Sequence, residues 1–370
     1  MEPMLVRNQL MNGLNEQIFY PEEYSDEANL FFLGYEIESS KVCPAEKVEG
    51  LKPKRLWVCR FCGKPWGQVK FNSDAHILSE SLGNRYLISD FECDSCNAIF
   101  GKYEDQLSKY LGLSRTAMLL DGKEKIPTFK PAGNGFRMDG EMYPGGTGAV
   151  MASREQSNQS FRYVAETSLL EIVGKKHPYT PYSVYKALVK MALSCLDENQ
   201  ISDYSLALDF VTNRAYQEEG RSFAHVIKYV YPYTYGHPTP MAYVFRKRFP
   251  NTPLFSHVVM LFAVNAIYEF AIPFNSDDLQ APEGELTLLH CPPLFSRSYR
   301  FPTTAIRKER LDFASIEPVK DEEDVLPFEV QPGQKIRGLV QNPETGEISE
   351  REFSIEDVSG VHISKVRLSE

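Results

Sequence analysis

The residues best placed for chemistry are four cysteines in two Cys-x-x-Cys pairs, Cys59 with Cys62 and Cys93 with Cys96. Each pair can place two thiolate sulfurs on one tight turn, and two such turns supply the four soft ligands of a closed tetrahedral zinc site. Disulfide bonds and thioredoxin-like redox pairs are the alternatives, but the sequence shows neither a secretory leader nor a βαβ pattern around the pairs. The spacing therefore predicts a structural Zn²⁺ ion.

A second set of functional groups lies between and just behind these pairs. The segment Asp74-Ala75-His76-Ile77-Leu78-Ser79-Glu80-Ser81-Leu82-Gly83-Asn84 holds the only histidine before residue 177, and Asn97 directly follows the last cysteine. These motifs resemble the HNH nucleases, in the branch that combines Cys-x-x-Cys, His-Ile or His-Val, a Leu-Gly-Asn or Leu-Gly-Gly turn, and Cys-x-x-Cys-Asn. The resemblance covers residues 59–105 of the 370.

The resemblance implies a ββα-metal module, treble-clef-like, in which a β-hairpin and a helix hold one catalytic divalent ion beside the scissile phosphate. His76 then matches the general base, and Asn97 matches a metal ligand at the start of the helix. Asn84 is the weaker match to the middle asparagine, because Ser89 and Asp90 lie nearer the usual distance from the second cysteine pair. The implied catalytic residues are thus His76, Asn84 and Asn97.

The chain departs from the family pattern at one position. Many members carry an acidic ligand immediately before the histidine, where this chain has Ala75. Residues two apart in an extended strand share a face, so Asp74 and His76 can both face the site, and Asp74, His76 and Asn97 are the expected holders of the ion. Phosphodiester hydrolysis needs a base near pH 7 and a cation at the phosphate, which neutral histidine and oxygen-ligated Mg²⁺ or Mn²⁺ provide.

Charge is distributed unevenly along the chain. The net charge is −10, yet residues 51–73 contain no acidic residue and six basic ones: Lys52, Lys54, Arg55, Arg60, Lys64 and Lys70. This window can anchor a duplex backbone, or it can be a solvated basic loop. Residues 317–370 carry 13 acidic and 6 basic residues. We expect this acidic segment either to restrain the module by competing with phosphate or to be a solvated tail.

The sequence favours a cytoplasmic protein with no membrane partner. No apolar run approaches the ~20 residues that span a bilayer, and the start of the chain lacks a basic-then-apolar leader. The remaining cysteines, Cys43, Cys195 and Cys291, lie in unrelated contexts and are expected to be buried small side chains in a reducing compartment.

The length predicts an α+β chain of more than one domain. We expect a leader at 1–50 packing on the nuclease module, the zinc-braced HNH module at 51–115, and a larger recognition or regulatory domain of helices and antiparallel sheet at 116–370. Within the module we predict strands at 66–71 and 74–78 and a helix capped by Asp94 or Ser95. Beyond it we predict helices at 180–197 and from 202, and strands at 224–231, 241–248, 258–264, 266–272, 286–290, 336–340 and 348–353.

Two functions fit these expectations. The first is a metal-dependent endonuclease that cuts nucleic acid, expected to be double-stranded DNA, with the larger domain receiving a regulatory protein or ligand or forming a homo-oligomer. The domain order resembles that of nucleases in bacterial antiphage systems, and this resemblance implies an antiphage setting. The second is a zinc-braced nucleic-acid or protein binding module without catalysis, and it is motivated by Ala75 in place of the acidic ligand.

Overall fold

The computed structural model has a mixed α+β fold with antiparallel sheets, as the sequence predicted at that level. The residues it describes are 3–5, 18–44, 46, 53–120, 125–130, 136–142, 147–154, 161–164, 166–230, 237–281, 286–296, 306–329, 336–341, 345, 348–353 and 360–366.

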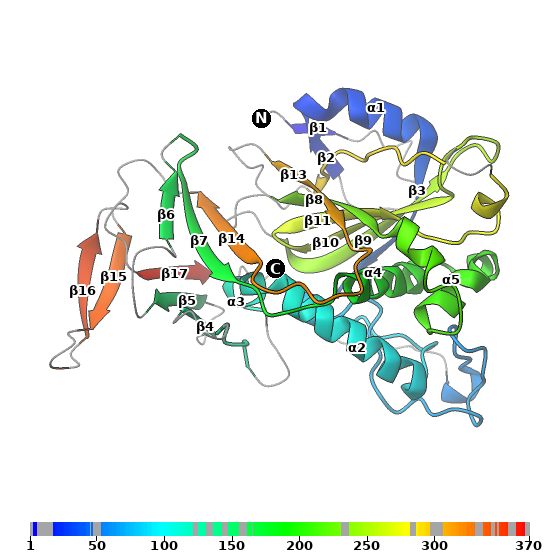
Figure 1. Cartoon of the computed structure of the whole chain (residues 1–370), viewed down its shortest axis with the longest axis horizontal. Helices are drawn as coiled ribbons and strands as arrows, with labels where there is room; N and C mark the ends of the chain where they lie inside the picture. The colour runs from blue at the N-terminus through cyan, green and yellow to red at the C-terminus, as the bar shows by residue number, and fades with distance from the viewer. Residues whose placement is uncertain are drawn as a thin grey trace.

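A six-stranded antiparallel sheet forms the largest layer (Figure 1). Its central strands β10 (His257–Val264) and β11 (Ala266–Ala271) are buried at every position, because alternate side chains enter two separate cores. Val259 and Leu261 enter one core, whereas Val258 and Met260 enter the other. The strand order is β13 (Arg307–Asp312), β8 (His225–Val230), β11, β10, β9 (His237–Lys247) and β3 (Tyr35–Val42).

Helix α1 (Ser25–Gly34) contributes to the core on one face of this sheet. The ring centroid of its Phe31 lies 4.9 Å from that of Tyr35 and 5.0 Å from that of Phe245. Strand β3 then pairs with β9 over its whole length. The described part of the leader therefore completes the large sheet through β3, and most of its buried apolar side chains lie in the core that α1 covers. Its Cys43 lies in the other core, which also contains Trp57 and Cys59 of the cysteine-rich module.

Two long helices are layered on the other face of the sheet. Helix α4 (Pro181–Cys195) lies between the sheet and helix α2 (Asp94–Leu111), and its residues from Val184 to Cys195 are all buried (Figure 1). One hydrophobic core runs from the cysteine pairs through both helices to the sheet. The segments before and after residue 115 therefore share a core, and the large part of the chain supports the cysteine-rich part directly.

The shorter elements complete the fold. Helix α5 (Ser205–Val211) matches the predicted second helix, and α3 (Leu113–Ala117) follows α2. Among the described residues, no helix is both long and apolar enough to cross a membrane. The small antiparallel sheets are β14 (Glu323–Glu329) with β7 (Leu169–Lys175) and β6 (Phe161–Val164); β17 (Gly360–Val366) with β5 (Thr147–Arg154) and β4 (Phe136–Met142); β15 (Ile336–Gln341) with β16 (Ile348–Phe353); and β1 (Pro3–Leu5) with β2 (Ile18–Pro21) and β12 (Phe295–Ser296).

Several strand predictions can be compared directly with the structure. The terminal hairpin is confirmed as β15 and β16. The predicted strand at 286–290 is wrong, because only Thr287 forms an isolated bridge there. The predicted strands at 66–71 and 74–78 are also reduced to isolated bridges. Gly67, at φ +95°, turns the chain inside the first of them.

The acidic segment does not begin as a solvated tail. Its strand β14 pairs with β7 and buries Leu326 and Phe328 in the main core. Asp324 is also buried, and its Oδ2 accepts a hydrogen bond of 2.9 Å from the Leu113 N–H at the start of α3. Although residues 317–370 have a negative net charge, apolar side chains alternate along β14, and their burial anchors the first part of the segment in the fold.

Candidate active site and zinc site

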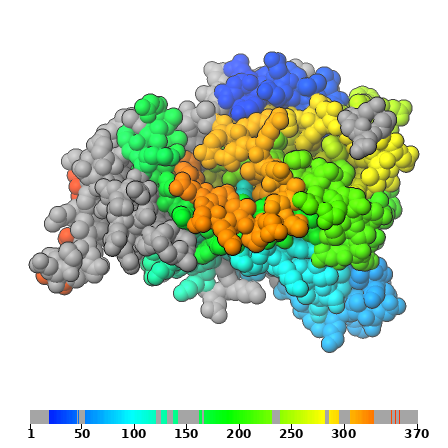
Figure 2. All heavy atoms as spheres, in the orientation of Figure 1, coloured from blue at the N-terminus to red at the C-terminus, as the bar shows by residue number. Residues whose placement is uncertain are grey.

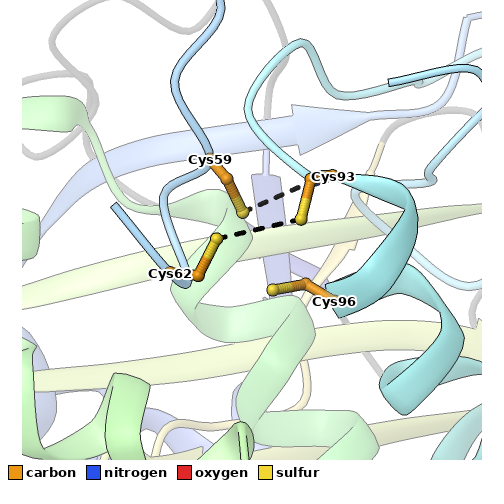
Figure 3. Close-up of side chains that lie close together, drawn as sticks. All are labelled: Cys59, Cys62, Cys93 and Cys96. Carbon is orange, nitrogen blue, oxygen red and sulfur yellow. Dashed lines mark hydrogen bonds between the residues drawn. The ribbon is translucent and has the colours of Figure 1, made fainter. Parts of the chain in front are cut away.

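The four cysteines converge on one point, with their sulfurs facing one another (Figure 3). Cys59 and Cys62 lie on a turn closed by a 2.8 Å hydrogen bond from the Gly63 N–H to the Cys59 carbonyl. Gly63 has φ +70°, a left-handed conformation that glycine adopts readily. Cys93 is the N-cap residue of α2, and Cys96 lies in the first turn of that helix. One tight turn and one helix start therefore position all four sulfurs.

The geometry of the sulfurs suits zinc. All four lie within 4.8 Å of one another, and the Sγ atoms of Cys62 and Cys93 are 3.8 Å apart. Tetrahedral Zn–S bonds of about 2.3 Å also separate the sulfurs by about 3.8 Å. Hydrogen bonding to Cys96 lowers the pKa of Cys59 to about 5, while burial raises the pKa of Cys93 to about 11. Only a cation would allow all four thiols to ionise together, so the cluster can form a zinc site.

His76 lies in a short hairpin that leads toward α2. It faces Ile88 in an antiparallel bridge. Two backbone hydrogen bonds flank the bridge: the Ser89 N–H donates to the Ala75 carbonyl at 2.8 Å, and the Ile77 N–H donates to the Leu87 carbonyl at 3.1 Å. The order along the chain is therefore hairpin, second cysteine pair and helix, and the backbone on both sides of His76 is fixed.

The imidazole of His76 is half-buried, and its Nδ1 atom is buried without a hydrogen-bond partner among the described residues. Burial lowers the pKa of His76, although the Glu80 and Glu104 carboxylates oppose the shift. The neutral imidazole is therefore the main form at pH 7. A buried nitrogen without a partner is unusual, and a neutral imidazole with a free lone pair is the form a general base needs.

Exposure alternates along the strand segment that carries His76. Asp74 is exposed, Ala75 is only 1% exposed, and Ile77 is again buried. The position directly before His76 thus faces the core, where a carboxylate would be separated from water. The Asp74 carboxylate, by contrast, is close enough to His76 to raise the pKa of the imidazole. Asp74 is thus an exposed acidic group near His76, although Glu80 and Glu104 affect the pKa of the imidazole more strongly.

Asn97 lies in the first turn of α2, where its N–H donates to the Cys93 carbonyl at 2.9 Å. Its side chain is half-buried and forms no hydrogen bond with another described residue. Asp94 Oδ1, at the same helix end, accepts hydrogen bonds from the N–H groups of Asn72 and Ser73 at 2.8 and 3.0 Å. These contacts fasten the chain that leads into Asp74 to the end of α2 that presents Asn97.

Asn84 is fully buried inside the hairpin loop. Its Nδ2 donates to the carbonyls of Leu78 and Leu87 at 2.5 and 3.1 Å, and its Oδ1 accepts a hydrogen bond from the Leu87 N–H at 2.9 Å. The side-chain amide therefore joins the two ends of the loop that follows His76. It makes these backbone contacts instead of facing the open side of the site.

Sequence analysis missed Lys190, a fully buried residue of α4. Its Nζ donates a 2.6 Å hydrogen bond to the His76 carbonyl and lies 3.0 Å from Glu92 Oε2 and 3.5 Å from Glu104 Oε1. Burial alone lowers the pKa of Lys190, but the two carboxylates outweigh it and raise the pKa, so the side chain stays charged. One indication of this role was present in the sequence: Lys190 is a cation in a mostly apolar helix, and the one other charged residue of that helix is Lys186.

The basic residues of the window 51–73 differ in their surroundings. Arg60 is not free for phosphate, because its Nη1 donates to the carbonyls of Leu193 and Leu196 at 2.7 and 2.9 Å. Its guanidinium also stacks on the Phe91 ring, 3.9 Å from the centroid. Arg60 thus satisfies unpaired carbonyls at the end of α4. Lys52 lies outside the described residues, and the remaining four are exposed: Lys54, Arg55, Lys64 and Lys70.

The hairpin, the cysteine cluster and α2 lie together in one continuous segment of the chain. Residues 59–110 match the HNH endonuclease family, from the first cysteine almost to the end of α2. The resemblance seen in the sequence is therefore confirmed for this segment, and the match indicates nuclease activity and nucleic-acid binding in general terms. No curated protein and no solved structure matches the chain.

Proposed function

We propose that the protein is a metal-dependent endonuclease that hydrolyses phosphodiester bonds in DNA, with His76 as the general base. The observation that carries this proposal is the buried Nδ1 atom of His76, which has no hydrogen-bond partner in the part of the chain that the structure describes and belongs to an imidazole whose pKa burial lowers, within the segment that matches the HNH family. A Zn²⁺ ion at the four cysteines would brace the turn and the helix start around the site.

Each residue of the site has a separate role in this proposal. His76 accepts a proton from the attacking water molecule, and its neutral form at pH 7 makes this transfer feasible. Asp74 and Asn97 offer the oxygen ligands that Mg²⁺ or Mn²⁺ prefers, and His76 is the third candidate ligand. The bound ion would stabilise negative charge on the phosphate and on the leaving oxygen. Asn84 and Lys190 position the loop and the backbone of His76.

The test is cleavage of supercoiled plasmid by the purified full-length chain with Mg²⁺ or Mn²⁺. His76→Ala should lower the rate by about 10²–10⁴-fold while zinc content and unfolding temperature stay unchanged. His225→Ala is the matched control, because His225 is exposed on β8 at the large sheet. Unchanged cleavage by the His76 variant, or equal loss in the control, would contradict the assignment of the base.

The binding module without catalysis is the second candidate, and the burial of Ala75 favours it, since the usual acidic ligand position faces the core here. The endonuclease and the binding module differ in whether Asp74 holds a catalytic ion. If Asp74 holds the catalytic ion, Asp74→Asn should raise the concentration of Mn²⁺ needed for half-maximal cleavage. A wild-type protein that binds DNA but never cuts it with any divalent ion would establish the binding module instead.

An antiphage role, with the large part of the chain receiving a regulatory protein or ligand, follows only from the resemblance of the sequence. Its test is phage plating on cells that express the wild-type chain or the His76→Ala variant. Protection by the wild type alone would support the role, and equal plating would contradict it.

A further inference from the structure

The cysteine-rich loop exposes an aromatic ring among cations. Trp66 is 52% exposed, whereas Trp57, the only other tryptophan, is 9% exposed. Trp66 has no ring contact with another described residue, and Lys54, Lys64 and Lys70 are all exposed around the same loop. We call Trp66 and these three lysines the knuckle face. Figure 2 shows residues 53–90, in blue, projecting at the lower right corner of the molecule.

Backbone pairing places Trp66 and Trp57 on the same side of the loop. Val58 and Pro65 form an antiparallel bridge, and the Trp66 N–H donates to the Trp57 carbonyl at 2.8 Å. Opposed residues of an antiparallel pair project to the same face, so Trp66 lies on the side of Trp57. The Lys54 Nζ is on that side too, 5.5 Å from the centroid of the Trp57 ring. The Lys54 ammonium therefore lies on the same side of the loop as Trp66.

The knuckle face also adjoins the candidate active site. The Asp94 N–H at the start of α2 donates to the Lys70 carbonyl at 2.9 Å, and Lys54 Nζ donates to the Phe71 carbonyl at 2.8 Å. The Lys54 ammonium and the Lys70 backbone are thus fixed next to the helix end that carries Asn97. A nucleic-acid strand held at the site would pass these cations.

We propose that the knuckle face binds unpaired nucleotides, with Trp66 stacking on a base and the lysines contacting the adjacent phosphates. This deepens the proposed function and rests on it: the preferred DNA has single-stranded or unpaired bases, in place of the intact duplex expected from the sequence. A ring that projects from a convex loop can reach the face of an unpaired base, whereas the bases of a duplex cover one another's faces. Cations beside the ring match the phosphate backbone.

A cavity next to the same loop has a charge that suits this role less well. Leu56 and Val58 line a cavity of about 250 Å³ together with Arg60, Asp90 and Glu198. Arg60 is the only cation among the lining residues, and its Nη1 donates to the carbonyls of Leu193 and Leu196. The two carboxylates of the cavity repel phosphate, while the knuckle face lies in a window, residues 53–73, that has no acidic residue, although Asp94 lies next to Lys54. The charge pattern therefore favours a nucleic-acid strand on the Trp66 side over a protein segment.

The test is binding by the full-length His76→Ala protein without added divalent ion, so that no cleavage occurs and the zinc is left in place. One DNA sequence is titrated as a single strand and as a blunt duplex, followed by tryptophan fluorescence and by anisotropy of a labelled oligonucleotide. We expect the single strand to quench Trp66 emission. Trp66→Leu should weaken single-strand binding by about 5- to 150-fold, with less than a twofold effect on the duplex.

Matched variants separate stacking from other effects. Trp66→Phe keeps a ring and should retain most of the single-strand affinity, and Phe249→Leu, which removes an exposed ring on the loop after β9, should change nothing. Lys64→Gln should reduce the slope of log affinity against log salt by about 0.7 for the single strand. Equal loss of single-strand and duplex binding in Trp66→Leu, or no loss at all, would overturn the inference.

The two proposals fail in different ways. If the wild-type chain never cleaves DNA but Trp66→Leu still loses single-strand affinity selectively, the proposed endonuclease function is wrong and the knuckle face stands. If His76-dependent cleavage is found but Trp66→Leu binds single strands as tightly as its parent, only the knuckle face is wrong.

Discussion

Lys190 donates a 2.6 Å hydrogen bond to the backbone carbonyl of His76, although the two residues are 114 positions apart in the chain. The ammonium is fully buried and lies between Glu92 and Glu104. Helix α4, which packs on the large sheet, therefore contacts the HNH segment and fixes the backbone of the candidate base. The large part of the chain is thus a structural component of the site, whatever else it binds.

Replacing Lys190 with methionine should weaken both the fold and the site. Glu92 would be left buried without its partner, and breaking such a pair typically costs about 3–5 kcal/mol of unfolding free energy. The His76 backbone would also lose its support, and misplacement by ~1 Å can lower a rate by about 10²-fold. Denaturant unfolding and plasmid cleavage measure the two effects.

Two comparisons isolate the positioning role. Lys186→Met removes another buried lysine one turn earlier on α4, whose Nζ donates to Asn213 Oδ1 at 2.7 Å and does not contact His76. It should lose stability but keep the kcat of cleavage. The double variant Lys190→Met, Glu92→Gln removes the unpaired charge and should regain stability without regaining kcat. Recovery of kcat together with stability would mean that Lys190 only stabilises the fold.

What the sequence could predict is local in origin. The cysteine spacing placed two sulfurs on each turn, and the residue after the last cysteine had to lie in the first turn of the helix, as Asn97 does. The period of apolar residues behind Pro181 likewise predicted α4. Each of these inferences depends on residues within a few positions of one another, where geometry leaves little choice.

What it could not predict depends on contacts between distant segments. Whether Lys190 was solvated or paired depended on Glu92 and Glu104, which lie in another part of the chain. The leader carried apolar residues that fitted any core, and only the pairing of β3 with β9 assigns them to the large sheet. The charge of residues 317–370 likewise hid a strand that pairs with β7.

Zinc removal should unfold the site from the start of α2. Because Cys93 caps the helix and Cys96 lies in its first turn, Cys93→Ser should abolish zinc binding and lower the unfolding temperature. Elemental analysis of the wild type should find about one zinc per chain. Cys43→Ala is the control, since Cys43 is buried outside the cluster and should leave zinc content unchanged. A folded, zinc-free wild-type protein would contradict the assignment.

Asn84→Ala should damage the hairpin loop while leaving the zinc in place. The substitution leaves two carbonyls and one N–H without their partner, and each unsatisfied buried group costs about 1–3 kcal/mol. We expect a lower unfolding temperature, normal zinc content, and a loss of cleavage that added Mn²⁺ does not rescue. Asn97→Ala should show the opposite pattern, with normal stability and partial rescue by Mn²⁺. Rescue of Asn84→Ala by metal would make Asn84 a ligand instead of a positioning residue.

The pH dependence of cleavage should report the environment of His76. The base acts in its neutral form, and burial lowers its pKa, so kcat/KM should persist as the pH falls through about 6.5, the ordinary histidine value, and decline only below it. The Glu80 carboxylate raises the pKa of His76, so Glu80→Gln should move this acidic limb to still lower pH. Glu219→Gln, on a distant turn before β8, is the control and should leave the profile in place. An acidic limb above pH 6.5, or one that Glu80→Gln leaves unmoved, would show that the group titrating in the rate is not His76.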